Sequence, residues 1–181
     1  MDFESKITSR EISQLLWERE MTLGTAESCT GGRVAEAIIA VPGASKYFKG
    51  GIVSYADEIK ERILGVDRQL IEEKTAVCED VAVAMVKGAC KALNTDYAIA
   101  VTGIAGPGGG TAEIPVGTIW LACGNEDNVA TCQLTEDNGR DKNLSEATHT
   151  ALEMFLEFLK GEEKGSEDDV EPQGEVKWGS N

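Results

Sequence analysis

Three short segments combine hydroxyl, basic and glycine residues in a way that could carry chemistry. They are AESCTGG (residues 26–32), SYADEIK (54–60) and TGIAGPGGG (102–110). Each follows an apolar stretch that is typical of a β-strand, and in open α/β sheets ligands bind at the carboxyl ends of the strands. The three segments are therefore expected to converge on one site.

The first segment places a hydroxyl and a thiol directly before an expected helix. Such a helix start offers free amide groups and a positive dipole end, which suit a phosphate or carboxylate, so Thr30 and Gly31 are candidate binding residues. Ser28 and Thr30 could equally be ordinary helix N-caps. Cys29 could be a reactive thiol or a small core residue.

The third segment must be a loop, because five glycines and one proline lie between Gly103 and Gly110. It is neither a Walker A loop nor a GxGxxG turn that opens a helix, since a strand-like stretch follows it. Its glycines, among them Gly106 and Gly108, could bring backbone amides close to an anionic ligand. A flexible connector is the alternative interpretation.

A general base must be found among few candidates, because the chain contains a single histidine. One histidine excludes a multi-histidine metal site, and His149 lies on the polar face of an expected helix, so a Ser-His-Asp triad is disfavoured. Lys60, in the first helical turn after Asp57, can act as a base if the helix dipole and burial keep its amine neutral. The alternative is a solvated helix residue. Ser45 and Ser54 are nearby candidate nucleophiles.

Alternating strand and helix patterns predict a three-layer α/β/α sandwich with a mixed, mostly parallel sheet. Strands are expected over the following ranges: 22–28, 50–56, 97–103, 116–124 and 128–134. Helices are expected from a capping box formed by Thr8 and Glu11, after Gly32, after the N-caps Asp57 and Asp67, and over 79–93 and 141–160.

Composition limits the function further. The formal net charge is −15, which argues against general nucleic-acid binding but allows one phosphate in a local pocket. Residues 161–181 carry seven acids and two bases with few aliphatic side chains, so we predict a domain over 1–160 and a disordered acidic tail over 161–181. Five cysteines without a Cys-x-x-Cys pair, no signal-peptide pattern and no long apolar run predict a cytoplasmic protein that does not enter a membrane.

The order and spacing of AESCTGG, GGIVSYADEIK and TGIAGPGGG, followed by PVGTIW, resemble the CinA C-terminal domain family from about Thr8 to Lys160. Characterised enzymes of this family are nicotinamide mononucleotide deamidases. The resemblance therefore implies hydrolysis of that carboxamide to nicotinic acid mononucleotide and ammonia, in pyridine nucleotide recycling. It also implies a Ser–Lys mechanism without metal or cofactor, and a homodimer or higher homo-oligomer is expected.

The resemblance also implies roles for individual residues. Ser45 in PGASKYF matches the nucleophile and Lys60 the base, while Ser28 and Tyr55 would complete the hydrogen-bond network around the amide. Whether Ser45 or Ser28 is the nucleophile stays open. Thr102 and the glycine loop would lie against the nucleotide.

Arg140 matches the arginine that would hold the phosphate. The chain departs from the family pattern at Ile114, where a lysine is usual, and at Leu144, where a second basic residue is frequent. These departures keep open a second hypothesis, a catalytically inactive nucleotide-binding or regulatory module. An interaction protein that acts through the acidic tail is a third.

Overall fold

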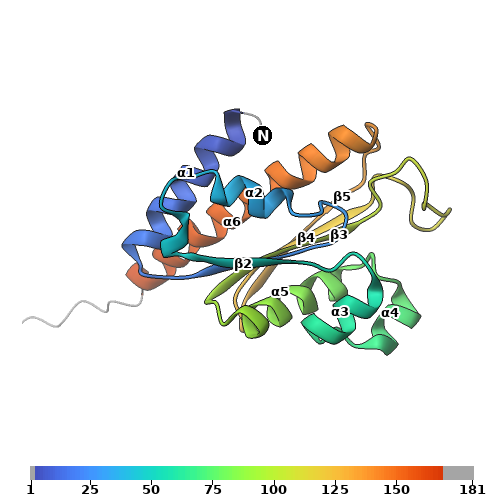
Figure 1. Ribbon diagram of the computed structural model, residues 1–181, viewed down its shortest axis with the longest axis horizontal. Coiled ribbons are helices and arrows are strands. Elements are labelled where there is room, and N and C mark those ends of the chain that lie inside the picture. Colours follow the sequence, from blue (N-terminus) through green and yellow to red (C-terminus); the bar gives the residue numbers. More distant parts are fainter. Residues whose placement is uncertain (1–2, 169–181) are drawn as a thin grey trace, which may run out of the picture.

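A five-stranded mixed sheet forms the middle layer of the computed structural model, which describes residues 3–168 (Figure 1). The strand order is β2-β1-β3-β4-β5, and the strands are β1 (Leu23–Glu27), β2 (Phe48–Val53), β3 (Tyr97–Gly103), β4 (Ile119–Gly124) and β5 (Val129–Leu134). β1 pairs in parallel with β2 and β3, whereas β4 pairs antiparallel with β3 and β5. β4 alone therefore runs against the other strands, which confirms the predicted mixed sheet.

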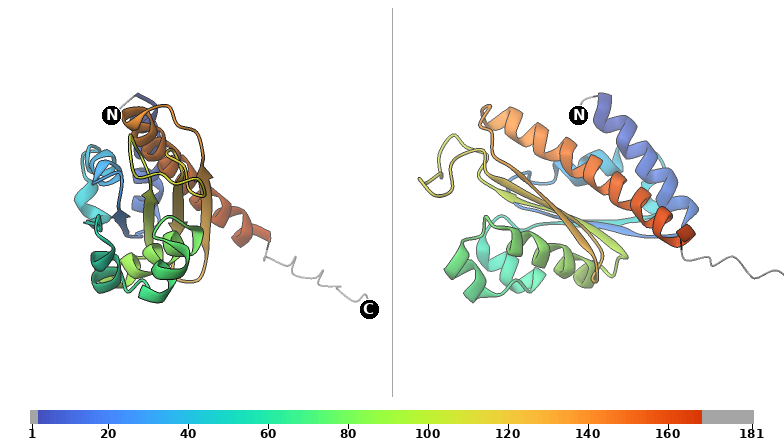
Figure 2. Two further views of the ribbon diagram at one scale, coloured as in Figure 1. Left: turned by 90° about the vertical axis from the view of Figure 1, so that its right-hand side faces the viewer. Right: turned by 180° about the vertical axis from the view of Figure 1, so that it is seen from behind.

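Helices cover both faces of the sheet. One face carries α1 (Phe3–Glu18), α2 (Arg33–Ile39) and α6 (Arg140–Asp168), and Figure 2 shows α1 and α6 side by side. The other face carries α3 (Asp57–Leu64), α4 (Arg68–Lys74) and α5 (Glu79–Leu93), and the 3-10 turn η1 (Ala44–Lys46) precedes β2. The three-layer prediction is confirmed.

Burial explains why β1 and β3 lie in the centre of the sheet. All five residues of β1 are buried, and β3 is buried from Tyr97 to Thr102, as its continuous apolar sequence predicts. One hydrophobic cluster fills the space under α1, α2 and α6, and a second fills the space under α5. Because β2, β1 and β3 are parallel, their carboxyl ends meet at one edge of the sheet.

Two helix boundaries differ from the predicted ones near the N-terminus. Helix α1 already begins at Phe3, and Thr8 lies inside it, where its hydroxyl donates to the carbonyl of Glu4 at 3.2 Å. The predicted capping box is therefore wrong, because residues before Thr8 continue the helix. Asp57 is the first residue of α3 rather than its N-cap, whereas Asp67 does cap α4 by accepting from the amide of Gln69.

Helix α6 is longer than predicted and continues into the acidic segment as far as Asp168. Glu162 is anchored there, because its carboxylate accepts from the hydroxyl of Tyr97 at 2.6 Å. The prediction of a disordered tail from residue 161 is thus wrong for 161–168, and its remainder, 169–181, lies outside the described residues.

Candidate functional site

The carboxyl ends of β1 and β3 and the start of α3 enclose a cavity of about 270 Å³. It brings together most of the predicted site residues, namely Ser28, Tyr55, Lys60, Thr102, Gly103, Gly106, Gly108 and Arg140. These residues come from all three segments that the sequence singles out. The expected convergence at one sheet edge is therefore seen.

Lys60 is the most unusual residue of the cavity. Lysines are almost never fully buried in proteins, and yet this one is only 1% exposed. Its Nζ donates to the backbone carbonyl of Ser54 at 3.0 Å and to Oδ1 of Asp57 at 3.2 Å. The amide of Ser54 in turn donates to the carbonyl of Glu27. These bonds link Nζ through Ser54 to Glu27, the last residue of β1, which Ser28 follows directly.

The loop after β1 is held by Glu27, whose buried carboxylate accepts hydrogen bonds from the amides of Gly32, Val34 and Ala35 at 2.9–3.1 Å. Glu27 thereby satisfies the donors at the start of α2. The expectation that this helix start would bind a phosphate is wrong, because a carboxylate of the chain already occupies it. Neither Ser28 nor Thr30 acts as a side-chain cap of this helix.

Ser28 follows Glu27 directly and is buried apart from 8% of its surface, and its residue lines the cavity. Within residues 3–168, the amides of Cys29 and Thr30 donate to no backbone carbonyl, and both interact with the Cys29 sulfur. Thr30 and Gly31 themselves are not among the residues that line the cavity. The turn carries Thr30 inward, to 3% exposure, and leaves Gly31 exposed.

The glycine loop is fixed by hydrogen bonds from α6. Arg140, the first residue of α6, donates from Nη1 to the carbonyl of Gly106 at 2.8 Å. Asn143 donates to the carbonyl of Ala105 at 3.1 Å and to Asp137, and it is buried. The loop is thus not a flexible connector, and its shape depends on the N-terminal turn of α6.

Asn143 was not predicted as a functional residue. A buried asparagine one turn after Arg140 is a weak signal that sequence reasoning could have used, because a buried amide needs partners. Thr102 also has a structural partner, since its hydroxyl donates to the carbonyl of Ala76 at 2.8 Å. This bond ties the segment before α5 to the end of β3.

Ser45 is not part of this cavity, and the predicted Ser45–Lys60 pair does not form within the chain. Ser45 lies in η1, before β2 begins, whereas Lys60 is bonded to Ser54, after β2 ends. The length of β2 separates them, about 17 Å for its six residues. Of the two serines left open by the sequence, Ser28 is the one that lines the cavity together with Lys60.

Three other candidates can be placed. The hydroxyl of Ser54 is buried without a hydrogen-bond partner among the described residues, and Ser54 is not a lining residue. Burial raises the pKa of the Cys29 thiol to about 11, so it is a neutral thiol at pH 7 rather than a nucleophilic thiolate. His149 is part of α6 and lies outside the cavity, with Nε2 at 3.2 Å from Glu153 on the same helix and 3.7 Å from Glu4 on α1.

The two departures from the family pattern have different positions. Leu144 is 3% exposed and belongs to the core under α6, so this position does not face the cavity. Ile114 lies in the segment between the glycine loop and β4, where its amide bonds the hydroxyl of Thr111. Neither residue lines the cavity.

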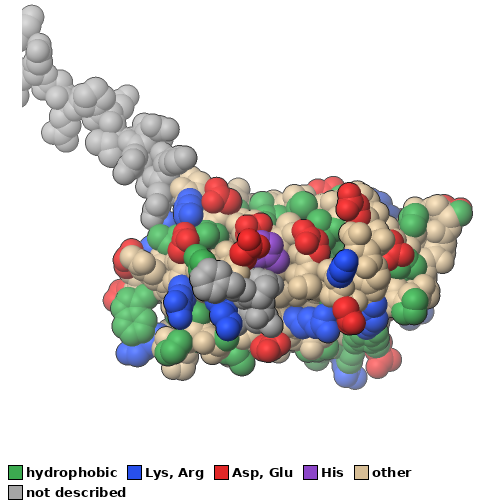
Figure 3. Space-filling model, turned by 90° about the horizontal axis from the view of Figure 1, so that it is seen from above, with side chains coloured by type: hydrophobic (Ala, Val, Ile, Leu, Met, Phe, Trp, Pro, Cys, Tyr) green, Lys and Arg blue, Asp and Glu red, His purple; other side chains and the backbone are tan. Residues whose placement is uncertain are grey.

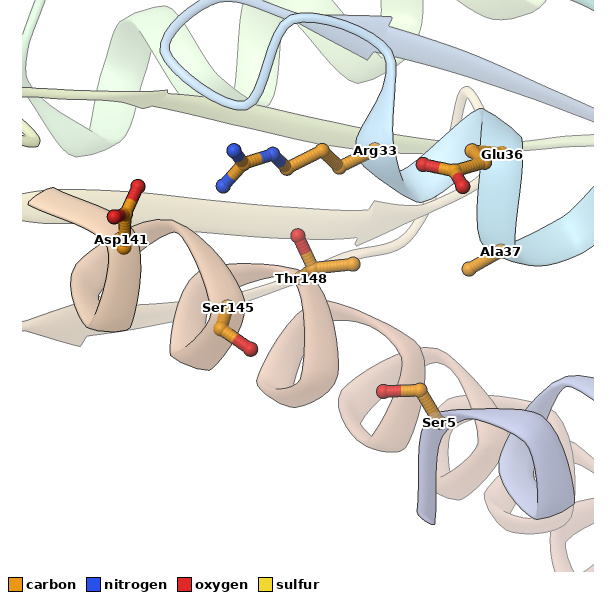
Figure 4. A pocket seen from close by; sticks show the side chains of 7 residues that line it. All are labelled: Ser5, Arg33, Glu36, Ala37, Asp141, Ser145 and Thr148. Atoms are coloured by element: carbon orange, nitrogen blue, oxygen red, sulfur yellow. The ribbon is translucent and has the colours of Figure 1, made fainter. Parts of the chain in front are cut away.

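A second hollow of about 330 Å³ lies between α1, α2 and α6 (Figure 4). Arg33 points across it toward Asp141, and Ser5, Ser145 and Thr148 add hydroxyl groups. Its lining includes the carboxylates of Glu36 and Asp141 but neither lysine nor histidine. Residues 3–168 also contain no cluster of three His, Cys, Asp or Glu side chains that could hold a metal ion, and no helix able to cross a membrane.

The model of the CinA C-terminal domain matches residues 5–159 of this chain. The chain belongs to the CinA C-terminal domain family. A CinA-like protein of Leptospira borgpetersenii is 49% identical over 117 residues, which are 65% of this chain and 28% of that protein. A CinA-like protein of Amoebophilus asiaticus is 41% identical over 150 residues, 83% of this chain and 36% of that protein. The chain thus spans about a third of the length of these curated relatives.

Solved structures of this family have the same fold. The competence/damage inducible protein CihA from Agrobacterium tumefaciens superposes with a TM-score of 0.84 at 36% identity, covering 88% of this chain and 98% of that one. A CinA superfamily protein from Escherichia coli gives a TM-score of 0.81 at 33% identity, covering 88% and 92%.

Proposed function

We propose that the protein hydrolyses the carboxamide of nicotinamide mononucleotide to nicotinic acid mononucleotide and ammonia. One observation carries the proposal: Ser28 and the buried Lys60 line the same cavity, as a nucleophile and a base must. Membership of the CinA C-terminal domain family supports it, because this is the reaction that the sequence resemblance implies.

In this mechanism Ser28 attacks the carboxamide carbon while Lys60 takes the proton from its hydroxyl. The amides of Cys29 and Thr30 are the donors closest in sequence to the oxyanion that forms, and such donors stabilise a tetrahedral intermediate. When the intermediate collapses, the C–N bond breaks and Lys60 or Tyr55 delivers the proton to the departing ammonia. Water then hydrolyses the acyl-serine and restores the Ser28 hydroxyl.

The nucleotide would be held by the glycine loop and Arg140. Within the described residues, the loop amides of Ala105, Gly106, Gly108 and Gly109 donate to no backbone carbonyl. The Arg140 guanidinium is exposed at the rim and uses only Nη1 for Gly106, so its remaining donors can bind phosphate oxygens. Tyr55 is 65% exposed and stands at the opening, where it can contact the nicotinamide ring.

We do not expect the protein to bind nucleic acids in general. On the face that Figure 3 shows, acidic and basic side chains are interspersed, and no broad basic surface is present there. A single mononucleotide bound by one arginine and several amides agrees with the formal charge of −15.

The test is to incubate the pure full chain with nicotinamide mononucleotide and measure ammonia together with the acid product. We expect turnover to be abolished in Ser28→Ala and retained in Ser145→Ala, which makes the same change at an exposed position of α6. Absence of turnover by the wild-type chain between pH 6 and 9 would contradict the proposal. Calorimetric binding without turnover would instead favour the non-catalytic nucleotide-binding module.

A further inference from the structure

In the part of the chain that the structure describes, Asp57 is the single acidic side chain that lines the candidate cavity, beside two basic ones. Lys60 comes from α3 and Arg140 from α6, helices that lie on opposite faces of the sheet (Figure 1). Asp57 is the first residue of α3, and its Oδ1 lies 3.2 Å from Nζ of Lys60. The carboxylate therefore belongs to the lysine side of the cavity, where the proposed chemistry occurs.

The first turn of α3 contains two acids, Asp57 and Glu58, and the positive end of the helix dipole stabilises both. They differ in what they contact. Asp57 lines the cavity and accepts a hydrogen bond from Lys60, whereas Glu58 is exposed and is not among the lining residues. A comparison of the two acids therefore separates an effect on the helix from an effect on the cavity.

The substrate and the product of the proposed reaction differ in charge only at the reacting group. Both mononucleotides contain the pyridinium ring, the ribose and the phosphate, but the carboxamide is neutral and the carboxylate is negative. A cavity with two cations and no acid would bind the product through both anionic groups, its phosphate and its carboxylate. Hydrogen bonds between charged groups are about twice as strong as neutral ones, so such a cavity would retain its product.

Asp57 counteracts this attraction in either protonation state of Lys60. Beside an ammonium group, the carboxylate forms a pair without net charge, which attracts a second carboxylate little. Beside a neutral amine, the carboxylate is uncompensated and repels an anion. The Lys60 side chain is almost completely buried, so solvent screens it little, whereas the Asp57 side chain is 52% exposed and is partly screened.

Glu27 does not replace Asp57 in this respect, although it precedes Ser28 and is also buried. Its carboxylate accepts hydrogen bonds from three amides of α2, and it is not one of the residues that line the cavity. The balance of charge at the lysine side of the cavity lining thus depends on one side chain.

We propose that Asp57 is a specificity-determining residue that makes the site prefer the neutral carboxamide to the carboxylate product. Repulsion of the wrong ligand is a common means of selectivity, and here it disfavours the product of the reaction. The inference rests on the proposed function, because that function supplies the two compounds that Asp57 distinguishes. It adds the order of their affinities, amide before acid, and names the residue that sets this order.

Calorimetry with the two mononucleotides tests the proposal in the absence of turnover. All proteins are full chains with Ser28→Ala, so that the carboxamide stays intact, and the measured quantity is the Kd of the acid divided by the Kd of the amide. We expect this ratio to exceed one. Asp57→Asn retains the size of the side chain and an acceptor for Lys60, and it should lower the ratio by about fivefold, the upper end for an exposed ion pair.

Glu58→Gln is the matched control, because it removes one negative charge from the same helical turn without changing the cavity lining. It should leave the ratio within about twofold of its starting value, since an exposed charge outside the cavity contributes little. Equal ratios in all three proteins, or an equal fall in both variants, would overturn the proposal. So would a ratio of one or less in the protein that retains Asp57.

Turnover distinguishes a failure of this inference from a failure of the proposed function. In chains that retain Ser28, Asp57→Asn should also strengthen inhibition by nicotinic acid mononucleotide by about fivefold. If the wild type turns over no mononucleotide, the proposed function fails, while the calorimetric ratio still decides the role of Asp57. If turnover occurs but the ratio does not depend on Asp57, only this inference fails. Binding of neither compound would contradict both.

Discussion

Nζ of Lys60 donates a 3.0 Å hydrogen bond to the backbone carbonyl of Ser54. Ser54 directly follows β2 and Lys60 lies in the first turn of α3, and the amide of Ser54 is itself bonded to Glu27 at the end of β1. The bond thus places a buried amine beside the loop that carries Ser28. The chemistry of the proposed site depends on this placement.

Replacing Lys60 separates a proton-transfer role from a purely electrostatic one. Lys60→Arg keeps a positive charge but cannot act as a base at neutral pH, and Lys60→Met keeps the volume without the charge. We expect both to lower kcat by about 100-fold or more, because general-base catalysis is worth about 10²–10⁴-fold. Ammonia release measures the effect, with Lys87→Met as a control. Near wild-type turnover by Lys60→Arg would rule out the base.

Glu27 should control both stability and the position of Ser28. Glu27→Ala leaves three amides of α2 without their acceptor, and we expect a loss of about 2–4 kcal/mol in the free energy of unfolding. Urea denaturation measures this loss. The exposed Glu36 on the same helix provides the control, since Glu36→Ala should stay within about 0.5 kcal/mol of the wild type. Equal effects of the two substitutions would disprove the role of Glu27.

Arg140 should distinguish a substrate with phosphate from one without. In Arg140→Ala we expect kcat/KM for nicotinamide mononucleotide to fall by about 10–100-fold, the worth of a charged hydrogen bond. For nicotinamide riboside, which lacks the phosphate, the ratio of variant to wild-type kcat/KM should stay near one. A similar fall for both compounds would show that Arg140 acts only by holding Gly106.

Three buried thiols, those of Cys29, Cys90 and Cys123, have raised pKa values, and they predict how stability changes at alkaline pH. Burial raises the pKa of Cys29 to about 11 and that of Cys123 to about 12, from an ordinary value of 9.0 that the unfolded chain regains. Above pH 9 the unfolded state therefore loses protons that the folded state keeps, so the free energy of unfolding falls as pH rises toward 11.

Urea denaturation at pH 8 and pH 10.5 should show this fall, by at least about 1 kcal/mol. The variant Cys29→Ala/Cys123→Ala removes two of the three thiols and leaves Cys90, so its stability should depend less steeply on pH in this range. An unchanged dependence would mean that other groups cause the fall. Because Cys29 stays protonated at pH 7, brief treatment with iodoacetamide at that pH should leave activity intact.

The sequence alone determined the fold class, most of the elements and the three segments of the site. Periodic apolar residues and glycine or proline punctuation are local signals, and they placed α5 and β3 at the predicted residues. Parallel strands bring their carboxyl ends to one edge, so the sequence order already implied that Ser28, Lys60 and Thr102 would meet. The extension of α1 and α6 was missed because it involves residues with weak local signals.

The tertiary structure decided which of these residues act together. The distance along β2 removes Ser45 from its own Lys60, although only fifteen positions separate them in the sequence. Glu27 occupies the start of α2, and Asn143 and Arg140 hold a loop more than thirty residues away in the chain. Such contacts depend on burial and on the direction of side chains in three dimensions, which the spacing of residues along one chain does not specify.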